Sequence, residues 1–374
     1  MPSTQSTSAQ STLTPATTPN KGALGSIGLC GSYKPLVAKG LLDGYKSSDV
    51  TPVIGRQYPD LQLSKLLKAP NADELIRDLA IVISQRGVAF FKKQSLTIHE
   101  QKELGNQLGA LSGRPLASGL HIHPTERSAE LPNDVSTIYS QRQAYHKYRT
   151  ALGRLASRGW HSDITFEPIP SDFAILKIKT LPETGGNTLW ASAYEVYDRL
   201  SPAYKKFVEG LTTEHEGNGF HQVAAAQGTK VYSEVRGSPA NVDNDLRAIH
   251  PVVRTNPITG WKGLFINQGF TKRIVELTKE ESEETLAYLF KLYNQNHDLQ
   301  VRYRWSKNNV AIWANGPTVH TATYDYDDTH EGDCVVSLGR SLTTILNLSA
   351  AVKLSVSNCS FDNTNASSLF ILHP

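Results

Sequence analysis

Four stretches of the chain carry the signals of helices. Residues 71–87, NADELIRDLAIVISQRG, begin with an asparagine that can cap a helix, have acidic residues in the first turn and end at a glycine. TIHE (97–100) and TKEE (278–281) are capping boxes, in which the threonine and the glutamate satisfy each other's backbone N–H groups. The first box predicts a helix to about Leu108, the second predicts a longer amphipathic one, and SPAYKKFVEGL (201–211) predicts a short one.

Elsewhere the apolar residues form short runs bounded by Gly, Pro or Asn, which is typical of strands. The predicted strands are VAFF (88–91), VSTIY (135–139), FAILKIKT (173–180), TLWAS (188–192), HPVVRT (250–255), GLFIN (263–267), LQVRYRW (299–305), VAIWA (310–314) and CVVSL (334–338). Many short strands with few helices predict a mainly β protein, a barrel or jelly roll with peripheral helices. No strand is followed by GxGxxG and a helix, so we do not expect a Rossmann fold.

Composition excludes some classes of protein. The chain has 374 residues, of which 39% are apolar and 20% charged, as in soluble globular proteins. It has 38 basic and 35 acidic residues, a net charge of +3, and the basic residues are scattered. We therefore expect no nucleic-acid partner. No window approaches 18 uninterrupted apolar residues, so no membrane span is expected.

The ends of the chain differ in character from its middle. Residues 1–45 start with a Ser/Thr/Pro-rich stretch without the apolar core of a signal peptide, and we expect a disordered or irregular tail. Residues 46–339 would form the folded domain. Residues 340–374 have few charges and no pattern tied to what precedes them, so we expect an atypical C-terminal tail. The three cysteines form no CxxC pair, which favours a reducing, cytoplasmic location.

The segment GWHSDITFE (159–167) contains the sharpest chemical signal. His161 and Asp163 are separated by one residue, so on an extended strand both side chains would face the same side. Together with an imidazole from a distant strand they would form a 2-His-1-carboxylate site, which binds Fe(II) and leaves positions open for a co-substrate and O2. Because HxD pairs also arise by chance, the spacing alone leaves an incidental reading open.

A second segment, residues 320–339, HTATYDYDDTHEGDCVVSLG, contains His320, His330 and Cys334. These side chains could form a metal site of their own, or one of them could complete a site that begins elsewhere. A partnership of His320 with His161 and Asp163 would argue against the separate site.

The chain resembles the taurine dioxygenase family over roughly residues 50 to 339. The resemblance rests on the HxD pair, then TGGNTLWAS (184–192), then HPVVRTNP (250–257), then the segment from Trp313 to His320, in this order. This family is the branch of Fe(II)/2-oxoglutarate oxygenases that also includes chlorophenoxyacetate and fungal sulfonate dioxygenases. It implies a double-stranded β-helix, a cupin-like jelly roll.

The resemblance also implies cofactors and ligands. Fe(II) would be bound by His161, Asp163 and His320, with 2-oxoglutarate as co-substrate. Thr188 matches the threonine that donates a hydrogen bond to a carboxylate of 2-oxoglutarate. The reaction would oxidise a C–H bond of a small organic substrate and release succinate and CO2. O2 and that substrate would be the partners, and a homo-oligomer is compatible with the sequence.

Three further positions match substrate-contacting residues of the family. His123, in HIHP, matches a histidine of the substrate pocket, and Phe270, in NQGFTKRI, matches an aromatic residue of the pocket wall. Ile164 directly follows the aspartate of the HxD pair and would also face the substrate.

The chain departs from the family at two arginines. His330 stands at the cofactor-binding position where an arginine pairs with the far carboxylate of 2-oxoglutarate, and Cys334 stands at the substrate position where a second arginine anchors anionic substrates. The family's WDNR is WANG here, with Ala314 and Gly316. Loss of a charge-assisted pair to a carboxylate costs roughly 2–5 kcal/mol. The alternative hypothesis is therefore a catalytically impaired homologue that retains the fold and the metal site.

Overall fold

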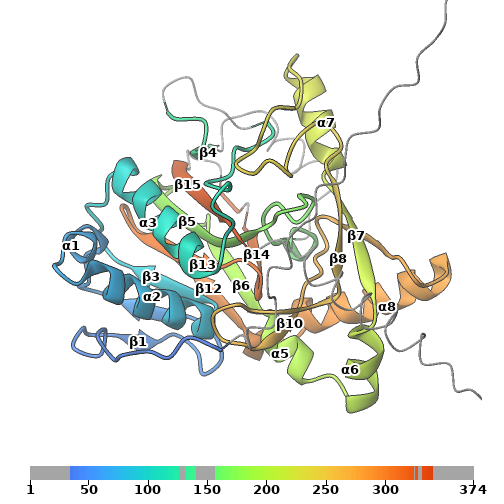
Figure 1. Ribbon diagram of the computed structural model, residues 1–374, viewed down its shortest axis with the longest axis horizontal. Helices are drawn as coiled ribbons and strands as arrows, with labels where there is room; N and C mark the ends of the chain where they lie inside the picture. Colours follow the sequence, from blue (N-terminus) through green and yellow to red (C-terminus); the bar gives the residue numbers. More distant parts are fainter. Residues whose placement is uncertain (1–33, 126–130, 140–155, 324, 327–330, 340–374) are drawn as a thin grey trace, which may run out of the picture. The chain divides into compact units, whose positions relative to one another are not determined.

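The computed structural model describes residues 34–125, 131–139, 156–323, 325–326 and 331–339 (Figure 1). By its internal contacts the chain divides into Met1–Lys34, of which only Lys34 is described, and a unit that starts at Pro35. In that unit the Leu36 N–H donates to the carbonyl oxygen of Ile258 at 2.8 Å, and Leu42 is buried in the core. Residues 35–45, part of the expected tail, thus pack against the domain although they contain no helix or strand.

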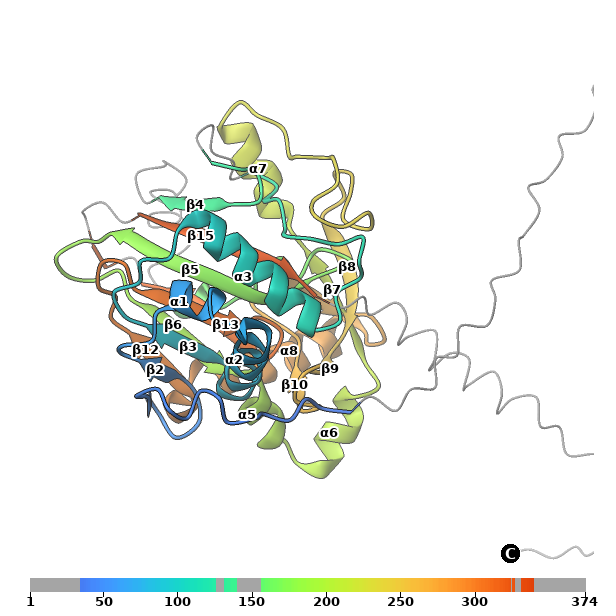
Figure 2. The ribbon, with the colours of Figure 1, turned by 60° about the vertical axis from the view of Figure 1, so that its left-hand side comes forward.

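A seven-stranded sheet forms the first β layer (Figure 2). Its strands, in spatial order, are β1 (Ser48–Asp49), β2 (Arg56–Tyr58), β3 (Val88–Phe91), β13 (Val310–Ala314), β5 (Ser171–Thr180), β15 (Glu331–Leu338) and β4 (Ser136–Tyr139). All neighbours pair antiparallel except β2 and β3. The order brings together strands far apart in the chain, because β5 lies between β13 and β15.

Three smaller sheets complete the β structure of the described residues. The first contains β12 (Gln300–Tyr303), β6 (Thr188–Ser192) and β14 (Thr318–Ala322), with β6 in the middle. The second contains β11 (Thr271–Ile274), β7 (Thr212–Glu216) and β8 (Arg247–Pro251), and the third pairs β10 (Lys262–Leu264) with β9 (Val253–Thr255). The fold is therefore mainly β, as predicted.

Helices cover the outer faces of the β layers. They are α1 (Leu63–Leu67), α2 (Ala72–Arg86), α3 (Ile98–Leu111), α5 (Ala193–Asp198), α6 (Pro202–Val208), α7 (Asn218–Ala226) and α8 (Lys279–Asn294), with short 3-10 turns at Ala156–Arg158 and His297–Leu299. In Figure 2, α2 and α3 lie in front of the seven-stranded sheet. No helix of the described residues is long and apolar enough to span a membrane.

Alternation along the strands divides the core into layers. On β3, β5 and β13, one set of side chains packs with α1 to α3, as Phe91, Ile175 and Ile312 show. The alternate set, such as Phe90 and Leu176, faces inward and packs with the inner residues of β6, β12 and β15. The functional residues considered below come from this inner layer and from the loops at its edge.

Two predicted capping boxes are present. Thr97 and Glu100 cap α3, and Thr278 and its partner Glu281 cap α8. Hydrogen bonds from Lys68 and, secondarily, from the Thr97 backbone lower the pKa of Glu100 to about 2. Asn71 precedes α2 as predicted, but its side chain makes no capping hydrogen bond.

Each predicted strand overlaps a strand of the structure. The bounds of β3, β6 and β13 are as predicted, whereas GLFIN (263–267) overlaps β10 only at residues 263 and 264. The expected strand 250–255 is split, because β8 ends at Pro251 and β9 begins at Val253. Two strands that carry important residues were not predicted, namely β7 and β14. Most residues of both strands are polar, with the sequences TTEHE in β7 and TVHTA in β14, so hydrophobic patterning does not reveal them.

Candidate active site

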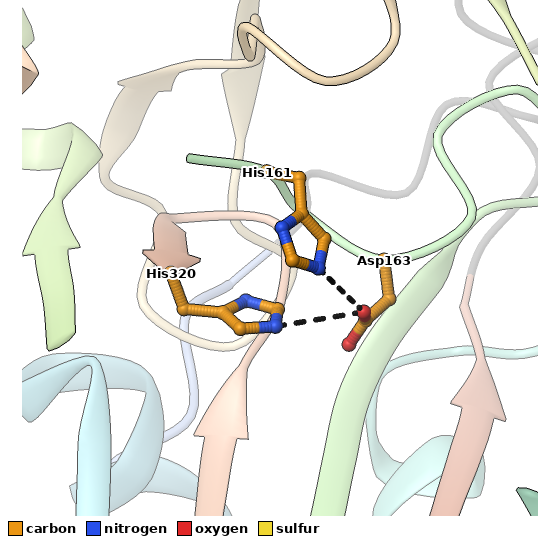
Figure 3. A group of neighbouring side chains, drawn as sticks. All are labelled: His161, Asp163 and His320. Atoms are coloured by element: carbon orange, nitrogen blue, oxygen red, sulfur yellow. Dashed lines mark ion pairs between the residues drawn. The ribbon is translucent and has the colours of Figure 1, made fainter. Parts of the chain in front are cut away.

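His161, Asp163 and His320 lie together, as Figure 3 shows. One oxygen of Asp163, Oδ1, is 3.6 Å from Nε2 of His161 and 3.6 Å from Nε2 of His320. One ligand atom from each residue can be chosen such that all lie within 4.8 Å of one another. Among the described residues this is the one group of at least three His, Cys, Asp or Glu side chains that could hold a metal ion.

A backbone bridge fixes the two imidazoles relative to each other. The N–H of His161 donates to the carbonyl oxygen of His320 at 2.9 Å, and the N–H of His320 donates back at 2.7 Å. His320 belongs to β14, whereas His161 forms only this isolated bridge. The expectation that His161 and Asp163 share an extended strand is wrong, because a turn begins at Asp163 and the next residue, Ile164, has φ +53°.

The hydrogen bonds of the cluster leave ligand atoms available. Nδ1 of His161 lies 2.8 Å from the carbonyl oxygen of Gly159, so Nδ1 carries the proton and Nε2 keeps its lone pair. Oδ2 of Asp163 is buried without a hydrogen-bond partner. A buried carboxylate oxygen without a partner is costly in the free protein and is what an ion would satisfy.

Burial shapes the protonation of two members of the cluster. Burial raises the pKa of Asp163, and the nearby His161 and His121 oppose this shift. Burial, with a smaller contribution from His161, lowers the pKa of His320 well below its usual value. His320 is therefore neutral at physiological pH, which is the form that binds metal ions. The donor set of two imidazoles and one carboxylate fits Fe(II).

A row of aromatic rings extends from this cluster. The ring of Phe270 lies edge-on to His161 with centroids 6.1 Å apart, and Phe220 stacks on Phe270 at 6.1 Å. His123 meets Phe220 edge-on at 5.0 Å. The structure thus links the predicted substrate residues His123 and Phe270 to the metal cluster. It adds Phe220 from α7, which no motif in the sequence singled out.

Thr188 is the first residue of β6, and its side chain is buried. The indole Nε1 of Trp305 donates to the Thr188 hydroxyl oxygen at 3.0 Å. A hydroxyl that accepts from one side keeps its own proton to donate elsewhere. Thr188 and His320 lie on the adjacent strands β6 and β14, where Trp190 pairs in register with His320.

The structure describes Cys334 but not His330, the two residues that stand at the positions of the family's arginines. Cys334 is buried in β15 and packs in the inner apolar layer, which also contains Ile164. His330 lies outside the described residues, so its role stays a prediction. A separate metal site of His320, His330 and Cys334 is not supported, since His320 lies with His161 and Asp163.

A buried ionic network next to the turn that begins at Asp163 was not predicted. Arg236 donates to both carboxylate oxygens of Glu167, at 2.5 and 2.9 Å, and Nε2 of His121 lies 3.0 Å from Glu167 Oε1. Burial alone would raise the pKa of Glu167, but the hydrogen bonds from His121 and Arg236 outweigh it and lower that pKa. The sequence gives no signal for this network, because its members are far apart and share no motif.

A second buried cluster of polar side chains contacts the turn that begins at Asp163. His215, which no motif in the sequence singled out, lies in β7, is fully buried and contacts the Thr165 hydroxyl at 2.9 Å through Nδ1. Asn267 donates to the same hydroxyl at 2.9 Å and accepts from the Phe270 N–H at 2.8 Å. Burial lowers the pKa of His215 well below its usual value, so this histidine is a neutral structural residue.

The three side chains described above could hold one metal ion at the edge of a mainly β domain. Residues 46–337 match the family described as taurine catabolism dioxygenase TauD, TfdA family. The chain belongs to this family, as the resemblance predicted.

Curated relatives agree with this assignment. The chain is 40% identical over 343 residues to an alpha-ketoglutarate-dependent dioxygenase of Penicillium shearii, covering 81% of this chain and 91% of the relative. It is 42% identical over 297 residues to one of Aspergillus oryzae, covering 78% of this chain and 87% of the relative. A solved taurine dioxygenase from Burkholderia xenovorans superimposes with a TM-score of 0.60 at 25% identity, covering 79% of this chain and 90% of the other. None of these likenesses points to the impaired homologue considered above.

Proposed function

We propose that His161, Asp163 and His320 bind the Fe(II) ion of a 2-oxoglutarate-dependent dioxygenase. The observation that carries the proposal is the convergence of three ligand atoms within 4.8 Å around a buried carboxylate. The chain is a dioxygenase of the TauD family, and it oxidises a C–H bond of a small organic substrate while 2-oxoglutarate and O2 yield succinate and CO2. We also infer that its sheets form the double-stranded β-helix expected from the resemblance.

The bound iron would supply the oxidising chemistry, and the protein residues would orient the reactants. The Gly159 carbonyl fixes the tautomer of His161, and the paired backbones of His161 and His320 hold both imidazoles. The Thr188 hydroxyl donates to a carboxylate of 2-oxoglutarate, while Trp305 fixes its orientation. We assign the second contact with this co-substrate to His330, which stands at the position of the family's arginine.

We propose that the substrate has no anionic group near Cys334. Cys334, in place of an arginine, offers no charge, and its side chain lies in an apolar layer with Ile164. Burial and the neighbouring His121 lower the pKa of His123 to about 3, so this pocket histidine is neutral as well. Phe220 and Phe270 add aromatic surface. These side chains fit an uncharged substrate with an apolar or aromatic part.

An anaerobic titration tests the ligand assignment. Addition of Fe(II) and 2-oxoglutarate is expected to produce the visible charge-transfer band of the iron chelate. His320→Ala and Asp163→Ala should abolish the band, while Asn309→Ala, a buried change at the far end of β13, should retain it. A band of full intensity in His320→Ala would contradict the assignment.

A turnover assay tests the substrate class. Succinate formation is measured with sulfonates, aryloxy acids and uncharged aromatic or alkyl compounds of similar size. Stimulation by uncharged compounds alone is expected. Strong stimulation by a sulfonate, undiminished in Cys334→Ala, would refute the substrate class without touching the assignment of the metal ligands.

A further inference from the structure

Asn315 holds the residue that supplies the carboxylate. It follows β13 and is fully buried. Its Oδ1 accepts from the Asp163 N–H at 2.9 Å, and its Nδ2 donates to the Asp163 carbonyl oxygen at 2.9 Å. A single side-chain amide thus satisfies both backbone polar groups of Asp163, as a neighbouring strand would do in a sheet.

Asn315 is itself fixed by its surroundings. Its Nδ2 also donates to the Ser171 hydroxyl at 2.6 Å, and its Oδ1 accepts from the indole of Trp313 at 3.4 Å. Its backbone N–H donates to the carbonyl oxygen of Asp172 at 2.8 Å. Since Ser171 and Asp172 begin β5 and Trp313 lies in β13, the amide transmits the position of two central strands to Asp163.

The turn after Asp163 needs such a restraint. Ile164 is β-branched, yet it has φ +53°, a conformation that costs about 1–3 kcal/mol for residues with a branched side chain. Such a residue keeps this conformation only when its surroundings impose it. Here Asn315 holds the turn at Asp163, and the Glu167 N–H closes it by donating to the carbonyl oxygen of Ile164 at 3.0 Å.

The two histidines do not depend on Asn315 for their relative position. His161 and His320 are joined through their own backbone bridge, so their separation is fixed without Asn315. Asp163 is not part of that bridge. Its carboxylate is placed against both imidazoles only as long as the turn keeps its strained shape.

We propose that Asn315 is a positioning residue of the metal site, which acts on the ion through Asp163 without touching it. This inference rests on the proposed metal ligands. Partners that orient a ligand typically contribute a factor of about 10–100 to metal affinity. Removal of the amide should therefore weaken metal binding by that factor and leave a folded protein.

Mn(II) binding to the full-length, metal-free protein tests the proposal without catalysis. Free Mn(II) is counted by electron paramagnetic resonance during a titration. Asn315→Ala is expected to raise the Kd about 10–100-fold. Asn315→Leu has a similar size but can neither donate to the Asp163 carbonyl oxygen nor accept from the Asp163 N–H, so it should also weaken binding.

Asn309→Ala is the matched control. Asn309 is also a buried amide and lies at the other end of β13, where it contacts the Lys93 N–H and the Tyr303 hydroxyl. Its loss should lower thermal stability and leave the Kd for Mn(II) within about threefold of wild type. A similar loss of stability in both alanine variants, with a change in affinity in Asn315→Ala alone, would support a positioning role.

Three results would contradict the inference or the ligand assignment on which it rests. An unchanged Kd in folded Asn315→Ala or Asn315→Leu would overturn the inference. Wild-type affinity in His320→Ala would instead overturn the ligand assignment on which it rests. If neither Asn315 variant folds, hydrogen exchange of the wild type still decides, because the Asp163 amide should be protected although it lies outside any strand. Fast exchange of this amide would refute the proposed role of Asn315 in positioning Asp163.

Discussion

Replacement of Arg236 by methionine removes the cation that neutralises Glu167 inside the protein. The two side chains are 1% and 0% exposed, so water cannot replace the lost partner. Arg236 also donates to the carbonyl oxygens of Tyr232 and Asp243, at 2.9 and 2.7 Å. The substitution therefore leaves a buried carboxylate with His121 alone and two carbonyl groups without their donor.

The expected loss of stability is large. Breaking a buried ion pair by removal of one partner costs about 3–5 kcal/mol. With an unfolding entropy of about 2.1 cal/mol/K per residue, a domain of roughly 300 residues loses about 1.6 °C in Tm per kcal/mol. Arg236→Met should therefore lower the Tm by about 5–8 °C.

Calorimetry or thermal fluorescence measures this shift, and Arg273→Met provides the control. Arg273 pairs with Glu214 at 2.9 Å, but its side chain is 53% exposed. Exposed pairs contribute about 0–1 kcal/mol, so this control should lower the Tm by less than about 2 °C. Equal shifts in the two variants would refute the argument that burial makes the Arg236 pair costly to break.

Three other changes have defined outcomes. Gly87→Ala should lower the free energy of unfolding by about 1–3 kcal/mol in a thermal unfolding assay. Gly87 has φ +71°, and a Cβ at this position would lie 2.9 Å from a methyl group on β14. Gly44→Ala is the control and should be nearly neutral, because no atom lies within 4 Å of its added Cβ. The stability difference between wild type and Glu100→Gln should be constant above about pH 4.5 and shrink as the pH falls towards 2, because the folded-state pKa is lowered to about 2; a difference that persists at pH 2 in acid unfolding curves would count against the lowered pKa. Trp305→Phe should raise the half-saturating concentration of 2-oxoglutarate about threefold to tenfold in succinate assays, because the Thr188 hydroxyl loses its fixed orientation; an unchanged value would show that Trp305 plays no such part.

Elements with strong periodic or capping signals could be predicted from the sequence. The helices α3 and α8 begin at their capping boxes, and β3 and β13 coincide with the short apolar runs that predicted them. In contrast, β14 reads TVHTA and has no marked alternation of apolar residues. It becomes a strand because its partner β6 supplies the hydrogen bonds, and this is tertiary context that a local pattern cannot contain.

The candidate site shows the same division. His161, Asp163 and His320 could be predicted because the spacing and the family resemblance mark them, and the structure brings them together. The reason given for the HxD spacing was wrong, since the two side chains converge through a turn. Glu167 and Asn315 escaped notice because their importance lies in contacts with residues far away in the chain.

The backbone bridge between His161 and His320 has a consequence for folding. Its two halves are distant in sequence, so they meet only through long-range contacts of the native fold. The unfolded chain holds no preformed pair of imidazoles, and an ion that binds them binds the native state alone. Metal would then stabilise the fold by mass action, by about 2.7 kcal/mol at a free concentration one hundred times the Kd. Removal of the metal would thereby lower the stability of the protein as well as its activity.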